Sequence, residues 1–552
     1  MSRRVVDPVA AVRRQLAAAA VEARRCRADD ARARAAPTDA PISEIPDDLW
    51  PRIASLVAQR AGGCDVLEAL LASEQRFRRL RNSWVFWREA CTRSFPAPPH
   101  PKVFPNAEAT PAGAAERLAY WRRRFDAWCR GKALVNGNGP NGIRRAVGLL
   151  TNGGATVPAD HFAGPIEQWY TEDVTNMNAL FLDEDGFDRN LNGWDFSNVT
   201  FMQRFVSGCD TFNHGGAPLT WNTFRVTDMM SALYGCDRLN VPLRMDTRAV
   251  TNMTGMLSGC EQFNNGGVPL ALNTSAVTTM SRMFAQSFHF NQPVAFDTSS
   301  VTDMSFMFFN CTRFNQTVQF NTARVTNMMY LFRRCNAFNN GDGQPLLLDT
   351  SSVTEMSSMF FQCESFNCPV PLNTSSATNM SGMFAGCTNF NQTCAFATQN
   401  VTRMDSMFDY CLGFNNGGQP LTMDTSSVTT MDAMFDRCMR FDQTITFATQ
   451  NVTSMRRMFN ECIRFNNGGV PLAFDTSSVV RMDMMLYEAT NFNQPLPWDV
   501  RNVQSFVKMF EFARSFAQPL DAWQVSPQAE TEGMFRGTRL EAQNLLPAWY
   551  QP

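Results

Sequence analysis

The sequence predicts a small all-α module near the amino terminus, followed by a mixed α/β solenoid with a period of about 24 residues. A phrase of the form V-T-x-M-x-x-M-F recurs fourteen times from residue 174 onward, and self-similarity at a fixed period is the signature of a repeat architecture. Charge divides the chain at the same region. Residues 1–145 hold 26 Lys and Arg against 15 Asp and Glu, whereas residues 146–552 hold 23 against 36, so we expect two segments with different tasks.

The composition argues against several classes of protein. Only 4 His are present and they are scattered, so neither a His-rich metal site nor a His-dependent active site is expected. No apolar run reaches the roughly 18–20 residues that span a bilayer, and Arg interrupts every apolar stretch of the first 25 residues, unlike a secretory signal. The 16 Cys are therefore expected to be reduced thiols, and no membrane partner is expected.

The all-α module is predicted at 42–92, where apolar residues recur at helical spacing. Leu49, Ile53 and Leu56 stand at i, i+4 and i+7, which places them on one face of a short helix. A Pro and two acidic residues precede this stripe, and both residue types favour a helix start. Two further apolar stripes follow, so we expect three short helices.

The segments around this module complete the predicted domain order. Residues 1–40 are rich in Ala and Arg, and this composition favours disorder. Residues 93–142 form a Pro-containing linker with one helix over 114–130. The exposed ends of a solenoid must be covered, so we expect an N-terminal cap at 143–173, the solenoid at 174–524 and a C-terminal cap at 525–552.

Each repeat carries apolar residues at fixed positions. With the Val of the phrase numbered zero, Met occupies position 3 in thirteen copies and position 6 in ten, while Phe occupies position 7 in ten and position 13 in thirteen. Positions 3, 6, 7 and 10 form one face of a short helix. The segment from position 13 to the next zero, such as FNQPVAFDTSS, suits a short strand and a polar corner. Stacked coils would then bury a continuous core.

Two repeated features allow both a structural and a chemical interpretation. Ten Cys occupy position 10, from Cys209 to Cys462, and could be metal ligands or disulfides. No second column of Cys or His stands beside them, which favours small buried thiols. The D-T-S-S corners, such as that at Asp297, could bind calcium, but Asn replaces Asp at Asn273 and an Asx-turn needs no metal. We therefore expect no metal and no cofactor.

The repeated phrase resembles the leucine-rich-like repeats of BspA-type bacterial surface proteins, in the version found in mycoplasmas. The resemblance rests on the series V-T-x-M-x-x-M-F-x-x-C-x-x-F-N-Q over about residues 160–520. It implies a leucine-rich-repeat-like solenoid that is used for binding and has no chemistry of its own.

The module at 42–92 resembles an F-box. The residues that carry the resemblance are Ile45, Pro46, Asp47, Asp48, Leu49, Ile53, Leu67, Leu70, Trp87 and Arg88. Ile stands at position 45, where the family usually has Leu. The resemblance implies docking on the Skp adaptor of a cullin–RING ubiquitin ligase, through Ile45, Pro46, Leu49 and Ile53.

The outward positions 5, 8 and 9 of the repeat vary most among the copies. Several hold aromatic or Arg residues, the types that anchor protein interfaces. Sequence variation among the copies is also least constrained at these outward positions, which would explain it without a partner. Solenoids, moreover, often bind partners through their strand face instead. The candidates for binding a target protein are Phe306, Phe309, Tyr330, Arg333, Arg334, Phe361, Tyr410 and Arg437.

An F-box followed by a repeat array predicts a substrate-recognition subunit of a Skp–cullin–F-box ubiquitin ligase, which acts by proximity. The alternative is a surface, adhesive or scaffold solenoid without a ligase role. No phosphate-binding glycine loop, zinc signature or Ser/His/Asp spacing occurs, so we expect no enzymatic activity, and we interpret the Arg-rich tail as solvated rather than bound to nucleic acid. The combination resembles proteins of large DNA viruses of amoebae, which implies the cytoplasm or nucleus of a eukaryotic host cell.

Overall fold

The computed structural model describes residues 143–151, 166–169 and 171–551. The chain divides into two compact units, Met1–Val174 and Thr175–Pro552. The expected tail, F-box module and linker all lie outside the described residues. In the first unit the described elements are α7 (Ile143–Thr151) and η3 (Ile166–Gln168), both within the segment expected as the N-terminal cap.

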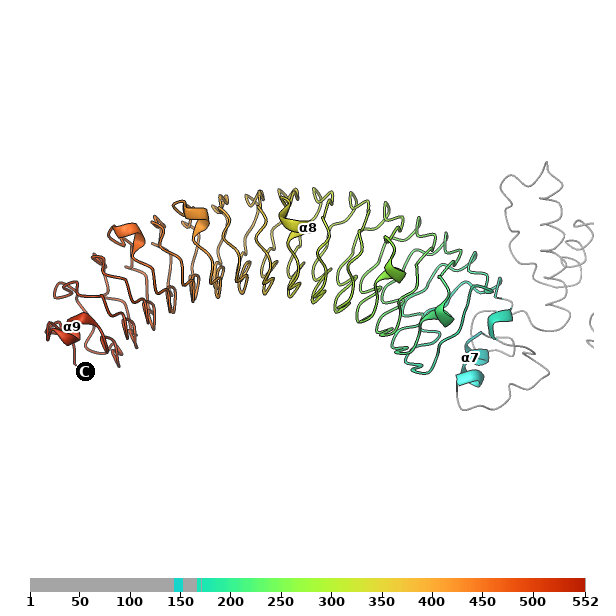
Figure 1. Ribbon diagram of the computed structural model, residues 1–552, viewed down its shortest axis with the longest axis horizontal. Coiled ribbons are helices and arrows are strands. Elements are labelled where there is room, and N and C mark those ends of the chain that lie inside the picture. The colour runs from blue at the N-terminus through green and yellow to red at the C-terminus, as the bar shows by residue number, and fades with distance from the viewer. Residues whose placement is uncertain (1–142, 152–165, 170, 552) are drawn as a thin grey trace, which may run out of the picture. The chain divides into compact units, whose positions relative to one another are not determined.

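The second unit is a solenoid of stacked coils that curves along its length (Figure 1). Single residue pairs bridge successive coils in parallel, and one such row joins position 2 of each coil to the next, from Asn176 to Glu530. The predicted repeat of about 24 residues is therefore confirmed. Regular secondary structure is sparse in the described part of this unit and consists of η4 (His214–Gly216), η5 (Asn265–Gly267), α8 (Asn340–Gly343), η6 (Asn416–Gly418), η7 (Asn467–Gly469) and α9 (Arg539–Ala542).

The helix predicted over positions 3–10 of each repeat is wrong. The amide of Met307 donates to the carbonyl of Met304 at 3.2 Å, which closes a tight turn, whereas the amide of Phe306 donates to Met329 in the next coil at 2.9 Å. Positions 5 and 9 take a positive φ, as at Phe306 (57°) and Asn310 (61°). Alternate amides thus bond within the coil and across to the next one. This arrangement places positions 3, 6, 7 and 10 inward, as a helix would.

The strand predicted between position 13 and the next zero is also wrong for most coils. Among the described coils, only three residue pairs bridge there, at Leu219–Leu243, Leu270–Val294 and Leu421–Ile445. Single backbone hydrogen bonds, as from Leu346 to Pro369 at 2.9 Å, and side chains link the coils there. For example, the Thr298 hydroxyl donates to the carbonyl of Asn321 in the next coil at 2.9 Å. Because Thr and Asn side chains bond the neighbouring backbone, a continuous strand ladder is not needed.

The core consists of the predicted Met and Phe columns, and the Met and Phe residues at positions 3, 6, 7 and 13 are buried in every described coil that has them there. Within one coil the rings of Phe284 and Phe290 lie 4.3 Å apart. Between coils, Phe284 stacks on Phe308 at 5.5 Å and Phe290 on Phe314 at 5.9 Å, with interplanar angles of 9° and 3°. Two columns of stacked rings therefore bind successive coils together, since offset aromatic pairs contribute about 0.5–1.5 kcal/mol beyond their buried area.

The repeat pattern continues into the segment expected as the C-terminal cap. The amide of Phe510 donates to the carbonyl of Met534 at 2.9 Å, as in the preceding coils. The short helix α9 follows, with Thr538 as its N-cap and Leu540 buried. The indole of Trp549 stacks on Trp523 at 6.3 Å and covers the last coil.

Candidate interaction surface

Five of the eight predicted target-binding residues come together in one continuous cluster. The rings of Phe306 and Tyr330, at position 5 of consecutive coils, lie 4.6 Å apart, and Phe309 lies 5.8 Å from Phe306. The guanidinium of Arg333 lies 4.8 Å from the ring centre of Tyr330 and 4.3 Å from that of Phe361. Because successive coils are stacked, residues at the same repeat position become neighbours on the surface.

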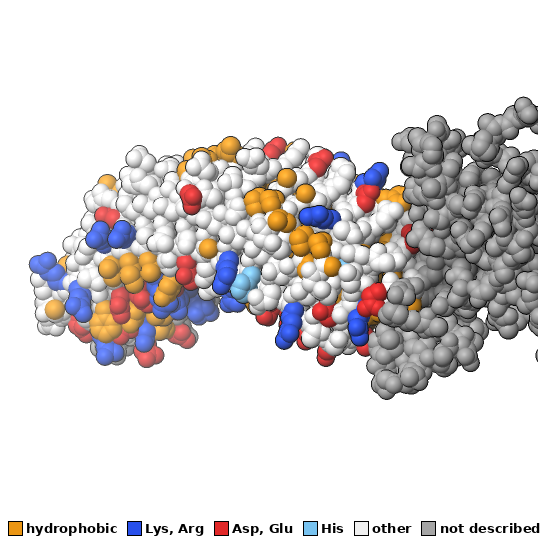
Figure 2. Space-filling model, turned by 45° about the vertical axis from the view of Figure 1, so that its right-hand side comes forward, with side chains coloured by type: hydrophobic (Ala, Val, Ile, Leu, Met, Phe, Trp, Pro, Cys, Tyr) orange, Lys and Arg blue, Asp and Glu red, His pale blue; other side chains and the backbone are white. Residues whose placement is uncertain are grey.

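One member of this cluster was missed in the sequence. Arg282 lies over the ring of Phe306, with its guanidinium carbon 4.6 Å from the ring centre. Arg282 could have been identified from its repeat position, because it occupies position 5 in the coil before that of Phe306. The cluster is called the aromatic–arginine patch and consists of Arg282, Phe306, Phe309, Tyr330, Arg333 and Phe361. Figure 2 shows hydrophobic and basic side chains side by side on one face of the array.

The patch is ordered by its own contacts. Arg333 is held between two aromatic rings, and each cation–π contact contributes about 0.5–2 kcal/mol depending on its exposure. The Arg333 side chain and the four rings are half-buried, while Arg282 is exposed. A partner would therefore meet side chains that have already lost much of their rotamer freedom, which lowers the entropic cost of binding.

The other three predicted residues do not join the patch. The Arg334 Nε donates to Gln362 Oε1 at 2.8 Å. Arg437 lies 5.4 Å over the ring of Tyr410, and its Nε contacts a carboxylate oxygen of Glu461 at 3.1 Å. Arg437, Tyr410 and Glu461 form a separate, internally paired group further along the array, whereas Arg334 lies in the same coil as Arg333 but is paired with Gln362.

A buried acidic side chain lies next to this second group. Asp436 is buried, and its carboxylate accepts hydrogen bonds from Arg457 Nε at 2.9 Å and from Asn460 Nδ2 at 2.6 Å. In the preceding coil, burial and the charge of Asp436 together raise the pKa of Asp409 to about 6. The hydrogen bonds of Asp436 therefore join its coil to the next one.

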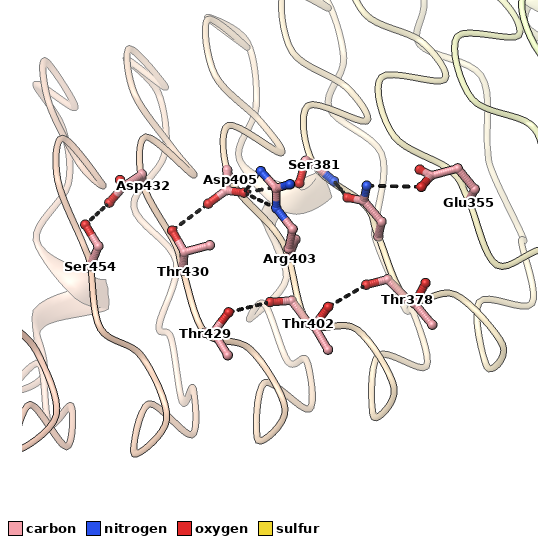
Figure 3. A network of polar contacts seen from close by, with 11 residues as sticks. Glu355, Thr378, Ser381, Thr402, Arg403, Asp405, Thr429, Thr430, Asp432 and Ser454 are labelled. Carbon is pink, nitrogen blue, oxygen red and sulfur yellow. Dashed lines mark hydrogen bonds and ion pairs between the residues drawn. The ribbon is translucent and has the colours of Figure 1, made fainter.

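A polar network covers repeat positions 2 and 4 (Figure 3). The Asp405 carboxylate accepts hydrogen bonds from Arg403 Nε at 3.1 Å, from the Ser381 hydroxyl at 3.2 Å and from the Thr430 hydroxyl at 2.6 Å. Ser381 belongs to the coil before that of Asp405 and Thr430 to the coil after it, so the Asp405 carboxylate joins three coils. This network was not expected from the sequence, where its signal is the recurrence of Ser, Thr, Asn and Asp at repeat positions 2 and 4.

The two repeated features with alternative interpretations have structural roles. The Cys311 thiol is buried and lies 3.0 Å from the carbonyl oxygen of Phe284, and burial raises its pKa well above the usual range. At a D-T-S-S corner, Asp349 Oδ1 accepts from the amide of Ser351 at 3.0 Å, which is the predicted Asx-turn. Within 143–151, 166–169 and 171–551, no group of three or more His, Cys, Asp or Glu side chains is placed to hold a metal ion.

The predicted adaptor-binding residues Ile45, Pro46, Leu49 and Ile53 lie outside the described residues. In the part of the chain that the structure does describe, no helix has the length and apolar character to cross a membrane.

Comparison with known proteins places the repeats in a family. No curated protein and no solved structure matches the chain. One protein-family model matches six overlapping segments, at 155–244, 217–295, 266–366, 344–447, 417–496 and 445–549. These segments run from 155 to 549 and cover more than half of the 552 residues, in agreement with the mycoplasma-type repeats expected from the sequence. The chain therefore belongs to the family described as Mycoplasma protein of unknown function, DUF285.

Proposed function

We propose that the repeat array recognises another protein, and that the chain is the substrate-recognition subunit of a Skp–cullin–F-box ubiquitin ligase. The observation that supports recognition of another protein by the array is the aromatic–arginine patch. Aromatic and Arg side chains dominate the binding energy of protein interfaces. Elsewhere on the described turn segments, as around Asp405, polar side chains are engaged with one another.

A contrast within the repeats supports a recognition role. The inward columns repeat the same Met and Phe in coil after coil, because each must fit the same core. The outward position 5 holds Arg282, Phe306, Tyr330 and Ser358 in four successive coils. The array is thus a regular scaffold on which each coil presents a different side chain, which suits a specific partner.

The ligase role rests on the resemblance of residues 42–92 to an F-box. In this proposal Ile45, Pro46, Leu49 and Ile53 dock the Skp adaptor while the array holds the target. Transfer is then promoted by proximity, because both proteins are held on one chain and their effective concentration rises. The chain needs no catalytic residue for this role, and it would act in the cytoplasm or nucleus of a eukaryotic cell, including one infected by a virus.

Gel filtration of the full chain with a purified Skp adaptor tests the ligase role. We expect the wild-type chain to elute with the adaptor, and a chain with Leu49→Arg and Ile53→Arg to elute alone. A chain with Tyr330→Ala and Arg333→Gln is the matched control and should bind the adaptor like wild type. If the wild-type chain does not bind the adaptor, the ligase role fails and a scaffold or surface solenoid becomes the better interpretation.

A further inference from the structure

The two arginines of the aromatic–arginine patch differ from a group of arginines further along the array. Several of those later arginines are paired with a carboxylate at ion-pair distance, as in Arg437–Glu461 at 3.1 Å, Arg457–Asp436 at 2.9 Å, Arg456–Asp483 at 3.1 Å and Arg481–Asp483 at 3.0 Å. Arg282 and Arg333 contact aromatic rings instead, and no carboxylate of the described residues forms an ion pair with either. The patch therefore carries two positive charges without a counter-charge.

Arg333 also lacks a hydrogen-bond partner at one nitrogen. Its Nε is buried and unpaired among the described residues, so the ring contacts alone orient the guanidinium. Holding a cation in this way has a cost in lost hydration, and a carboxylate that pairs with the guanidinium would offset it. The geometry is that of a preformed anion-binding group set within an apolar surface.

We propose that the aromatic–arginine patch binds an acidic segment of a partner protein in which carboxylates flank apolar or aromatic side chains. The carboxylates would pair with Arg282 and Arg333, since the planar guanidinium matches a carboxylate in two parallel hydrogen bonds. The apolar side chains would pack on Phe306, Phe309 and Tyr330. This inference rests on the proposal that the array recognises a protein, and it names the chemistry of that protein.

The register of the coils defines the spacing of the two charges. Arg282 and Arg333 belong to coils that begin at Val277 and Val325, with one coil between them. Two steps of about 4.8 Å separate their main chains by about 10 Å along the array, a distance that about three residues of an extended segment span. In a segment with the polyproline II conformation, which has three residues per turn and rises about 3.1 Å per residue, two acidic residues three apart lie on the same side and would reach both arginines.

Single-stranded nucleic acid also stacks on aromatic and Arg side chains, but the charge of the array opposes it. Residues 146–552 hold 36 Asp and Glu against 23 Lys and Arg, a net charge of −13. A nucleic acid requires a basic track for its phosphates, whereas an acidic peptide needs only the two local cations. The observations therefore favour a peptide.

Fluorescence anisotropy with the full chain tests the inference. The probe is a labelled peptide in which Glu-Leu-Phe-Glu stands between Gly and Ser residues, and the same peptide with Gln for Glu is the comparison. We expect saturable binding of the Glu peptide that weakens at least about tenfold with Gln in the peptide, and also with Arg282→Gln and Arg333→Gln in the chain. Arg313→Gln, which removes an exposed Arg of the same region, should leave binding unchanged.

Several results would overturn the inference. They are equal binding of the Glu and Gln peptides, no effect of the double substitution in a chain with an unchanged thermal midpoint, no saturable peptide binding, or binding of a labelled single-stranded oligonucleotide alone. Selection from a random peptide library separates this inference from the proposed function. If the array selects peptides without acidic residues, protein recognition stands while the acidic partner is wrong.

Discussion

The Cys311 thiol lies 3.0 Å from the carbonyl oxygen of Phe284 in the preceding coil and donates a hydrogen bond to it. All ten Cys at repeat position 10 make the same contact with the residue at position 7 of the coil before. In one coil Ser takes the place of Cys at position 10, as Ser287, and its hydroxyl donates to the carbonyl oxygen of Leu257 at 2.8 Å. In these eleven coils the column holds a small buried donor, while Ala489 and Ala513 occupy it without one in two later coils, so the column needs a small buried side chain rather than sulfur chemistry.

Substitution of Cys311 should separate hydrogen bonding from size. We expect Cys311→Ser to be tolerated best, because Ser287 already makes this contact, and Cys311→Ala to cost about 1 kcal/mol more through the lost bond. Cys311→Leu should cost about 1–3 kcal/mol, because the site is fully buried and closely packed. Urea unfolding followed by circular dichroism measures the order. Equal stability of the Ser and Ala variants would show that the donor contributes nothing.

A ladder of Asn side chains at repeat position 14 offers a second test. The amide of Asn339 donates to Asn315 Oδ1 at 2.8 Å, and its own Oδ1 accepts from the amide of Asn367 at 2.8 Å. Asn339→Ala should destabilise the array by about 1–3 kcal/mol, because the Asn367 amide loses its acceptor. Asn339→Asp should cost less, since Asp442 accepts from the Asn466 amide in the same ladder. The prediction fails if the urea midpoints of the two variants coincide.

The repeat period and the core were predictable because apolar spacing reports directly on burial. Met304 and Phe308, for example, are buried as expected. The local backbone was not predictable from that spacing, since the turn series and a helix bring the same positions inward. The available signal was glycine, which stands at positions 5 and 9 of the same coil as Gly255 and Gly259, with φ values of 59° and 75°.

The candidate surface was predictable in part for a similar reason. Phe306 and Tyr330 share position 5 in consecutive copies, so their contact follows from the register once the coils stack. The insertion of Arg333 between Tyr330 and Phe361 depends on side-chain rotamers, which no spacing reveals. The network around Asp405 joins short polar residues whose types are common in any loop, so the sequence did not distinguish it.

His214 is a third point at which the structure predicts a measurable response. Its Nδ1–H donates to the carbonyl of Ala217 at 2.8 Å, and its Nε2 accepts from the amide of Leu191 at 2.9 Å. The neutral ring is thus required, and burial lowers the pKa of His214 below its ordinary value of 6.5, against smaller opposing effects of the hydrogen bond to Ala217 and of the Asp188 charge. Because the unfolded chain binds a proton more readily, stability should fall as the pH drops below about 6.5.

The variant His214→Asn should remove this pH dependence. Asn265 occupies the equivalent place in a later coil, where its Oδ1 accepts from Leu243 at 2.8 Å and its Nδ2 donates to Val268 at 2.9 Å. We expect the variant to match wild type at about pH 8 and to be the more stable protein at about pH 5, as measured by urea unfolding. His289→Gln is the control. An unchanged pH dependence in His214→Asn would show that another group is responsible.

Asp409 should respond to pH in the opposite direction. Burial and then the charge of Asp436 raise the pKa of Asp409 from 3.8 to about 6, although Arg437 and Arg457 oppose the shift. The folded chain therefore holds this proton more tightly than the unfolded chain, so the contribution of Asp409 to stability is present below about pH 4 and is lost as the pH rises through about 6.

We expect Asp409→Asn to stabilise the array by about 1 kcal/mol at about pH 7, because Asp409 is only half-buried and solvent screens part of its charge, and to have little effect at about pH 4. Asp405→Asn makes the same change in the same coil. It should instead destabilise the array at about pH 7, because the Asp405 carboxylate accepts from Arg403, Ser381 and Thr430. Urea unfolding of both variants at the two pH values measures the contrast. A loss of stability in Asp409→Asn at about pH 7 would mean that the arginines outweigh burial and that the ionised carboxylate stabilises the stack.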